Sequence, residues 1–473
     1  MKVRRPSPVP ILLASLLGAA YRPVQSFIFP SSSQSQCRLP PAIATSTLPL
    51  RPNDEVGAST STAIHMASSN TKKKKSGRSG GGAGLKGFGS STSSASSKSL
   101  SASSSTGVVD RSPSSLKFYS YLERNGAESN LKRVGLGNFP LQIGPSAQDT
   151  IQLRGVIALR DIAKGETIIE IPYEMALDLG RESADPTLPA TTLLQKYCTW
   201  KSGNDGPPVD KDRGDYFAML PPYLSEDCLG STDFFSDGAL DMLQSPLVVE
   251  ETLLRRELVQ LRYERDVEPM SQISSNLYRW DENEIATQSH LQWASWIITS
   301  RVLTVQGSPD SNSAYRLLIP LIDMCNHDRD SPHILTGRAM PGGLLKVVAG
   351  VGIKAGEAIN IGYGGGVEGN DRFIQDYGFL DGGGSKERGK GGDKEFVAEG
   401  YKIVARKLLG KGGSRTLTKM TAAESERALE ALKPTSLEED EMLLASGTIV
   451  RSDERMALEY RIGIKKALQG FNA

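Results

Sequence analysis

Apolar residues follow two different spacings along the chain, and together they predict both helices and short strands. Leu116, Tyr119 and Leu122 recur at the helical interval, so a helix is expected within 115–128, and Asn125-Gly126 should end it. Over 154–172, two short apolar runs lie on either side of a polar segment. That pattern predicts two strands around a turn.

The stretch from about 178 to 310 has a helical pattern instead. In one segment, Leu254, Leu258 and Leu261 share a helix face, and charged residues occupy the other faces. A later segment, "HLQWASWIITSRVLTV", again has helical spacing and carries Arg301 near its end. We therefore expect a helical insertion between the first strands and the strands that follow it.

Short strands are expected again in "GGLLKVVAGVGIKAGEAINIGYGGG". Two stretches, 162–166 (IAKGE) and 353–357 (IKAGE), share one form. Each has a hydrophobic residue, then small or basic residues, then Gly-Glu leading into a strand. We expect them to form similar hairpin turns at both ends of one β domain.

The end of the chain is predicted to be helical after a Gly- and Lys-rich loop over 381–395. Ser436 followed by Glu439 is the pattern of a capping box ahead of an apolar run, with Thr435 as an alternative cap. The region 395–473 is therefore expected to fold as a small helical unit.

Length and charge narrow the class of protein. The chain has 473 residues, enough for about two or three folded units. Its formal net charge of +1 gives no electrostatic case for binding nucleic acid or an anionic membrane. The absence of any Cys-x-x-Cys pair argues against a structural zinc and a disulfide scaffold. The cysteines are widely spaced: Cys37, Cys198, Cys228 and Cys325.

Residues 1–27 resemble a secretory signal peptide, because basic residues precede an apolar run that is too short to span a bilayer. Residues 28–112 have the composition of a transit peptide and linker, and their apolar surface is too small to order them. A signal peptide joined to a transit peptide, with Phe27 at the junction, resembles the bipartite presequence of complex plastids. We expect plastid import and no stable membrane span. The alternatives are a secretory, cytosolic or nuclear location, the last because of Lys72–Lys75.

The segment "LLIPLIDMCNHDRDSPH", from 317 to 333, follows a predicted buried strand with residues that can do chemistry. Asn326-His327 alone could cap the end of a strand, or it could bind a cofactor. A metal site is a third possibility, although no second ligand cluster appears elsewhere. The residue types that suit zinc or manganese are His327, Asp328, Asp330 and His333.

The order of motifs from about residue 118 onward resembles the SET-domain methyltransferases of the Rubisco large-subunit methyltransferase type. The motifs are "FYSYLERNGA", "GVIALRDIAKGETIIEIP", "WASWIITSRVL", "LIPLIDMCNHD", "GEAINIGY", "DYGF" and "TSLEEDEMLL" with "RMALEYRIGIKKAL". The resemblance implies an α+β fold. It would comprise a β-rich SET domain over 113–385 with a knot-like crossing, the helical insertion at 178–310, and a C-terminal helical region that contributes to substrate binding over 395–473.

The resemblance also implies S-adenosylmethionine as the methyl donor. Arg301 would contact the carboxylate of the donor, as a guanidinium does well. Asn326 would lie near the amino-acid end, and His327 would bind adenine mainly through its main chain. The full set of implied cofactor-binding residues is Gln152, Leu153, Arg154, Arg301, Asn326, His327 and Phe379.

The implied acceptor is a lysine side chain of a protein partner, with Asp323 on the substrate side. Tyr363 and Tyr377 would flank the transfer point as catalytic residues. A free lysine has a pKa of about 10.4, so only about one in a thousand is neutral near pH 7. Tyrosine hydroxyls can orient the neutral amine without adding the negative charge that would keep it protonated. No metal and no nucleic acid are implied, and we expect a monomer.

Two features depart from the family pattern. The family usually has Gly-x-Gly ahead of the first strand, whereas this chain has Leu153 in place of the first glycine and keeps only Gly155. The region after Tyr377 is also short, so the substrate cannot be carried over from Rubisco. Three alternatives stay open: a protein-histidine methyltransferase of the same fold, a SET-fold interaction protein without activity, and a metal-dependent hydrolase.

Overall fold

The computed structural model describes residues 106–142, 150–182, 185, 187–203, 213–225, 229–310, 313–366, 368–382, 397–408, 421–432 and 435–470. The predicted signal peptide, nearly all of the predicted linker and most of the Gly/Lys loop lie outside these residues. Among the helices of the described ranges, none combines the length and the apolar character needed to cross a membrane.

Short strands and helices alternate along the chain, as the spacing of apolar residues predicted. The strands are β1 (Val108–Val109), β2 (Val134–Gln142), β3 (Thr150–Ala158), β4 (Thr167–Pro172), β5 (Leu177–Arg181), β6 (Leu303–Gln306), β7 (Ala314–Leu318), β8 (Asn326–His327), β9 (Ile334–Thr336), β10 (Leu344–Val348) and β11 (Ala358–Ile361). The α-helices are α1 (Pro113–Arg124), α2 (Thr187–Lys201), α4 (Gly214–Phe217), α6 (Asp237–Leu243), α7 (Pro246–Arg262), α8 (Glu268–Ile273), α9 (Gln288–Arg301), α10 (Asn370–Arg372), α12 (Glu399–Leu408), α13 (Ala422–Ala431), α14 (Leu437–Ala445) and α15 (Ser452–Gly470).

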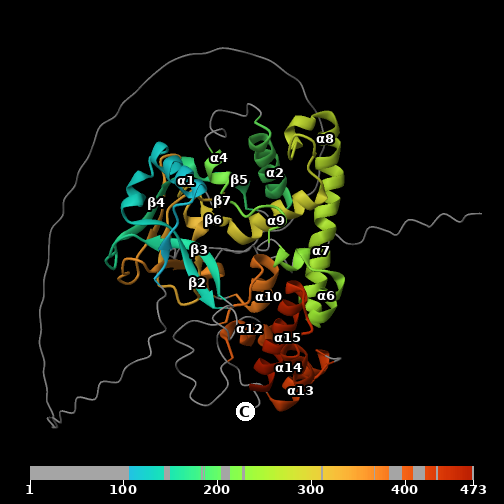
Figure 1. Cartoon of the computed structure of the whole chain (residues 1–473). Coiled ribbons are helices and arrows are strands. Elements are labelled where there is room, and N and C mark those ends of the chain that lie inside the picture. The colour runs from blue at the N-terminus through green and yellow to red at the C-terminus, as the bar shows by residue number, and fades with distance from the viewer. Residues whose placement is uncertain are drawn as a thin grey trace, which may run out of the picture. The chain divides into compact units, whose positions relative to one another are not determined.

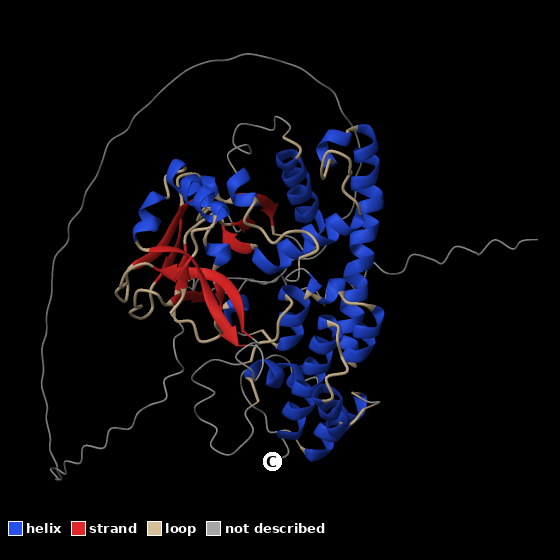
Figure 2. Cartoon of the chain, viewed as in Figure 1, coloured by secondary structure: helices blue, strands red, loops and turns tan. Residues whose placement is uncertain are grey.

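The strands form three small sheets in one half of the picture, where a few helices accompany them, and most helices lie in the other half (Figure 2). One five-stranded sheet has the order β1-β2-β3-β11-β8, and two three-stranded sheets have the orders β4-β10-β9 and β5-β7-β6. All pairings are antiparallel except β8 with β11, which run parallel. The predicted α+β class is confirmed.

The prediction of two hairpin turns is wrong, because the two turns pair with each other. Ile162 and Ile353 form an antiparallel bridge, and each backbone N–H donates to the other's carbonyl at 2.9 Å. The N–H of Gly356 donates to Ala158 at 2.8 Å, next to this bridge. Each turn therefore carries the chain from one sheet to another, since β3 pairs with β11 and β4 pairs with β10. Local spacing identified the turns, but it carries no information on which strand becomes the partner.

The predicted linker also ends earlier than residue 112. Val108 and Val109 pair with Asn138 and Gly137 of β2, so the five-stranded sheet begins before α1. Ser112 then caps α1, because its hydroxyl accepts the backbone N–H of Ser115 at 3.3 Å. A strand of two residues is too short to produce an alternating pattern in the sequence.

The helical insertion is flanked by strands rather than by loops. β5 and β6 occupy the two ends of the segment, and the helices between them run from α2 to α9 (Figure 1). Helix α9 is buried along nearly its whole length, with Trp293 fully inaccessible at its middle. Its indole donates to the carbonyl of Pro221 at 2.9 Å. The helix therefore forms the centre of the insertion and delivers Arg301 at its C-terminal end.

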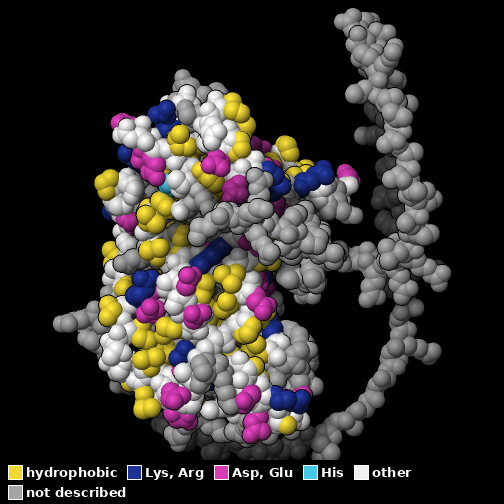
Figure 3. All heavy atoms as spheres, turned by 90° about the vertical axis from the view of Figure 1, so that its right-hand side faces the viewer, with side chains coloured by type: hydrophobic (Ala, Val, Ile, Leu, Met, Phe, Trp, Pro, Cys, Tyr) yellow, Lys and Arg dark blue, Asp and Glu magenta, His cyan; other side chains and the backbone are white. Residues whose placement is uncertain are grey.

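The C-terminal helices form a second core with α6 and α7 (Figure 1). The carboxylate of Asp453, in the first turn of α15, accepts the backbone N–H and the hydroxyl of Ser236 at 3.0 and 2.9 Å. The predicted capping box is confirmed, with Ser436 and not Thr435 as the cap of α14. The face containing α7 carries mixed acidic, basic and apolar side chains (Figure 3).

Candidate active site

A sharp turn separates the buried strand β7 from Asn326-His327. β7 ends at Leu318, Pro320 follows, and Leu321 has a φ of 70°, in the left-handed region that a leucine rarely adopts. A 3-10 turn over Ile322–Met324 comes next. Asn326 and His327 then form the separate strand β8, so they do not simply end the preceding strand as expected. Pairing with Asn360 and Ile361 of β11 holds them in place.

Asn326 contacts the stretch that was expected to form the cofactor wall. Its Nδ2 donates to the carbonyl oxygen of Arg154 at 3.1 Å. Gly155 makes this approach possible, because a Cβ at that position would lie 2.4 Å from the same Nδ2. Gln152 and Leu153, the two residues before Arg154, are exposed on β3. The glycine that the chain retains is therefore the one that Asn326 requires.

His327 is held by the segment that follows β11. Its Nδ1 accepts the backbone N–H of Tyr363 at 3.1 Å, and its ring lies 5.2 Å from the ring of Tyr363 and 4.6 Å from that of Phe373. Burial lowers the pKa of His327 to about 4, so the imidazole is neutral near pH 7. No group in the described ranges hydrogen-bonds its buried Nε2. These features give a neutral, fixed ring next to the phenols.

The two predicted catalytic tyrosines lie side by side. The rings of Tyr363 and Tyr377 stack with centroids 4.8 Å apart, and Phe379 lies 5.9 Å from Tyr377. The hydroxyl of Tyr363 donates to the carbonyl oxygen of Cys325 at 2.7 Å. Burial raises the pKa of Tyr363 well above its usual range, which keeps the phenol protonated. With its hydrogen committed to Cys325, the phenol oxygen can only accept a hydrogen bond from a substrate.

Asp323 lies at the centre of a buried polar group. Its Oδ2 accepts the hydroxyl of Tyr216 at 3.0 Å and lies 3.7 Å from the guanidinium of Arg301, which also donates to the Asp323 carbonyl at 3.0 Å. Burial raises the pKa of Asp323 to about 6, against the opposing effect of Arg301. Sequence reasoning missed Tyr216, because nothing in its local pattern distinguishes it from a core tyrosine.

The structure thus brings together two groups of predicted residues. Asn326, His327, Tyr363, Tyr377 and Phe379 form one, and Asp323 with Arg301 forms the other. The second adjoins the first because the Tyr363 phenol lies within electrostatic range of both charges. Gln152 and Leu153 reach the site only through their chain neighbour Arg154, whose carbonyl accepts from Asn326.

The possible metal ligands do not converge. Asp328 accepts the backbone N–H of Asp330 at 2.9 Å, and His333 accepts that of Gly350 at 3.4 Å. Across the described part of the chain, no three or more His, Cys, Asp or Glu side chains are grouped so that they could hold a metal ion. Asp328 and Asp330 instead form a local turn.

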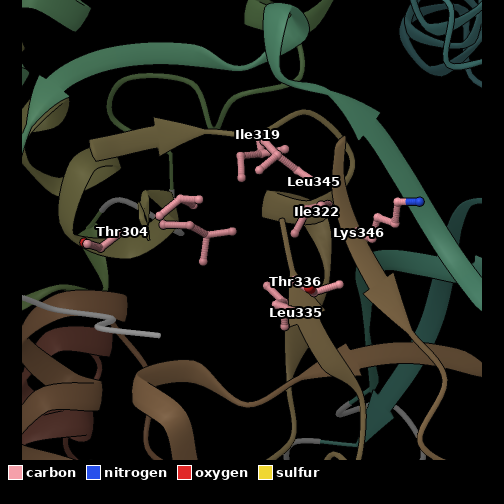
Figure 4. Close-up of a pocket in the computed structure, with 9 residues that line it drawn as sticks. Thr304, Ile319, Ile322, Leu335, Thr336, Leu345 and Lys346 are labelled. Carbon is pink, nitrogen blue, oxygen red and sulfur yellow. The ribbon is translucent and has the colours of Figure 1, made fainter. Parts of the chain in front are cut away.

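An apolar pocket is lined in part by Ile322, which belongs to the same 3-10 turn as Asp323. Its cavity volume is only about 20 Å³, and it is open to solvent. Figure 4 shows that Lys346 turns its amino group away from the other labelled side chains, and this amino group pairs with Glu170 at 2.5 Å. The lining comes from β6, β9, β10 and the turn: Leu303, Thr304, Val305, Ile319, Ile322, Leu335, Thr336, Leu345 and Lys346.

Residues 153–364 match the family model of the SET domain. The fold is similar to the SET domain of LSMT bound to MeLysine and AdoHcy, with 18% identity, a TM-score of 0.50, and coverage of 76% of this chain and 91% of that chain. Two further similar structures are the SET domain of LSMT bound to Lysine and AdoHcy (16% identity, TM-score 0.48, coverage 77% and 91%) and Rubisco LSMT bound to AdoMet (17%, 0.46, 76% and 91%). No curated protein matches the sequence.

Proposed function

Because residues 153–364 form a SET domain, we propose that the protein is an S-adenosylmethionine-dependent protein-lysine N-methyltransferase. One observation supports this most strongly. At the end of that domain, the ring of Tyr363 stacks on Tyr377 of the following segment at 4.8 Å, while the Tyr363 backbone N–H bonds to His327. Two neutral phenols beside the Asn-His strand are what methyl transfer to an amine needs.

The residues around β8 fit the methyl donor. Gly155 leaves the space that the Asn326 carboxamide fills beside β3, and this holds Asn326 at the expected cofactor wall. In the described part of the chain, the contacts of the Arg301 guanidinium are with Asp323, and donors remain for a carboxylate. When bound, the donor supplies a sulfonium methyl group that a nucleophile can displace.

The phenols act on the acceptor amine. The Tyr363 oxygen accepts from the amine because its own hydrogen is used by Cys325. The Tyr377 ring is buried and the Tyr363 ring is partly buried, so they favour the uncharged amine and stabilise the partly cationic transition state. Asp323, whose pKa is raised next to Arg301, is the residue that we assign to the substrate side of the site.

The test is methyl transfer from labelled S-adenosylmethionine to proteins of a plastid extract and of a cytosolic extract, with the purified full chain as enzyme. We expect one labelled protein, and fragmentation mass spectrometry should place the methyl group on a lysine. Label on a histidine would support the sibling activity of the same fold. Calorimetry with S-adenosylhomocysteine addresses the non-catalytic alternative, because an interaction protein that has lost its donor site shows no saturable binding.

We extend the proposal to the location and the partner. The composition of residues 1–112 supports import into a plastid, and the partner is a protein that presents a lysine side chain. The predicted location can be tested by fusing a fluorescent protein to the C-terminal end of residues 1–112 and imaging the cells. Secretion, or a diffuse cytosolic or nuclear signal, would contradict plastid import.

A further inference from the structure

Tyr377 lies in a helix turn of unusual hydrogen bonding. Residues Phe373–Tyr377 form a π-helical turn, and the N–H of Gly378 donates to the carbonyl of Phe373 at 3.0 Å. Such turns are frequently found at functional sites. Rings of His327 and Tyr363 pack against Phe373 and Tyr377 from the sheet side. Polar contacts to the same turn come from the helical insertion.

Arg255 of α7 bridges two carboxylates in the core. Its guanidinium lies 2.7 Å from Asp376 and 2.7 Å from Asp233, and the three side chains are at most 5% exposed. Asp376 is the direct chain neighbour of Tyr377, and Asp233 lies in the turn that precedes α6. A single buried cation therefore joins the insertion to the segment that carries the phenol.

A second set of contacts joins the same two segments. The hydroxyl of Ser231 donates to the carbonyl of Gln375 at 2.9 Å. Gly378 has a φ of 79°, and a Cβ there would lie 2.7 Å from the backbone of Gly230. The side chain of Gln375 donates to the carbonyl of Val248 in α7 at 3.1 Å. These contacts have no role in the proposed chemistry, yet they surround the π-helical turn.

We propose that this group of contacts, the Arg255 clamp, positions the Tyr377 phenol for methyl transfer. Arg255 is then a positioning residue, because it acts through Asp376 and touches neither the donor nor the acceptor. The clamp would give the insertion a role in catalysis, since Tyr363 bonds to the segment 325–327 whereas Asp376, the neighbour of Tyr377, is held from α7. The kinetic part of this inference rests on the proposed function.

The clamp predicts which variants move the phenol. Arg255→Lys keeps the charge but loses the two-pronged geometry that joins both carboxylates. Ser231→Ala is a milder change that removes only the hydroxyl bond to Gln375. Arg262→Lys is the matched control. Arg262 also lies in α7 and bridges two aspartates, Asp185 and Asp266, but it does not contact the turn over 373–377.

The first measurement is hydrogen exchange of the backbone amides over 373–379. Arg255→Lys and Ser231→Ala should speed exchange there, while Arg262→Lys should leave it unchanged. This measurement needs no activity, so it reports on the clamp even if the chain transfers no methyl group and the proposed function fails. Unchanged exchange in both clamp variants would overturn the proposal.

The second measurement is kinetic and uses the full chain with its identified substrate. Arg255→Lys should lower kcat about tenfold while the Kd for S-adenosylhomocysteine stays within about twofold. In a Tyr377→Phe background, the same substitution should change kcat by less than about twofold, because the phenol is already gone. An equal loss of kcat in both backgrounds would show that Arg255 serves stability alone.

Discussion

Gly155 offers a direct test of the site, because one methyl group at this position collides with a predicted cofactor ligand. A Cβ on Gly155 lies 2.4 Å from Nδ2 of Asn326, where ordinary contact begins at 3.4 Å. The carboxamide must therefore retreat by about 1.0 Å, the difference between these two distances. Its 3.1 Å hydrogen bond to the Arg154 carbonyl then lengthens beyond bonding range.

The energetic cost of Gly155→Ala follows from that lost bond. A polar group left without its partner in a partly buried site costs about 1–3 kcal/mol. If this cost falls on the donor complex, the Kd for S-adenosylhomocysteine rises about five- to 150-fold. Backbone strain does not contribute, because the φ of Gly155 lies outside the left-handed region. Removing a glycine from a strand is otherwise favourable by about 0.5–1 kcal/mol.

Isothermal titration calorimetry with S-adenosylhomocysteine measures the effect, and Gly135→Ala is the matched control. Gly135 lies in the neighbouring strand β2, and the nearest atom to a Cβ there is the Tyr119 hydroxyl at an ordinary 3.4 Å. We expect Gly135→Ala to bind within about twofold of the natural chain, since no contact changes. The reasoning fails if Gly155→Ala binds normally, or if both variants lose affinity equally.

Three further predictions follow from single side chains. Tyr363→Phe should keep S-adenosylhomocysteine binding within about twofold and lower single-turnover methyl transfer at least about a hundredfold, since the oxygen that orients the amine is gone; unchanged turnover would contradict its role. Burial raises the pKa of Asp323 from 3.8 to about 6. The free energy of unfolding is therefore highest below pH 4, and it falls by on the order of 3 kcal/mol as the pH rises from about 4 to above 6. The Tm advantage of Asp323→Asn over the natural chain should therefore be larger at pH 8 than at pH 5, and an equal advantage at both would refute the assignment. Ser436→Ala removes the oxygen that accepts the Glu439 N–H at 3.1 Å and should lower the free energy of unfolding by about 1 kcal/mol in a denaturant titration, whereas an unshifted midpoint would show that the cap contributes nothing.

Local pattern in the sequence was sufficient for the elements whose determinants are neighbours in the chain. The helix beginning near Ser115 and the capping box at Ser436 are contained within a few residues, and both are present. The motif order also placed Asn326-His327 and Tyr363 close together, because β8 and β11 are adjacent strands. Each of these predictions needed only short-range physics or a motif that spans the contact.

Pairing over long distances could not be predicted in the same way. The stretches 162–166 and 353–357 look like two separate hairpin turns, but in the structure they pair with each other. Tyr216, which lies within the insertion, bonds to Asp323 at a separation of 107 residues, and a buried tyrosine has the same local pattern whether or not it has such a partner. Contacts between residues so far apart in the chain produce no periodic pattern in the sequence, so local spacing cannot predict them.

The two phenols of the site therefore depend on different parts of the chain. Tyr363 follows β11 directly, and its backbone and hydroxyl bond to the segment 325–327, so the sheet is enough to place it. Tyr377 reaches the same point through a π-helical turn that Arg255 holds from the insertion. A substitution in the sheet should consequently affect donor binding and transfer together. A substitution in α7 should affect transfer alone, because the bonds that hold β8 and Tyr363 are made without α7.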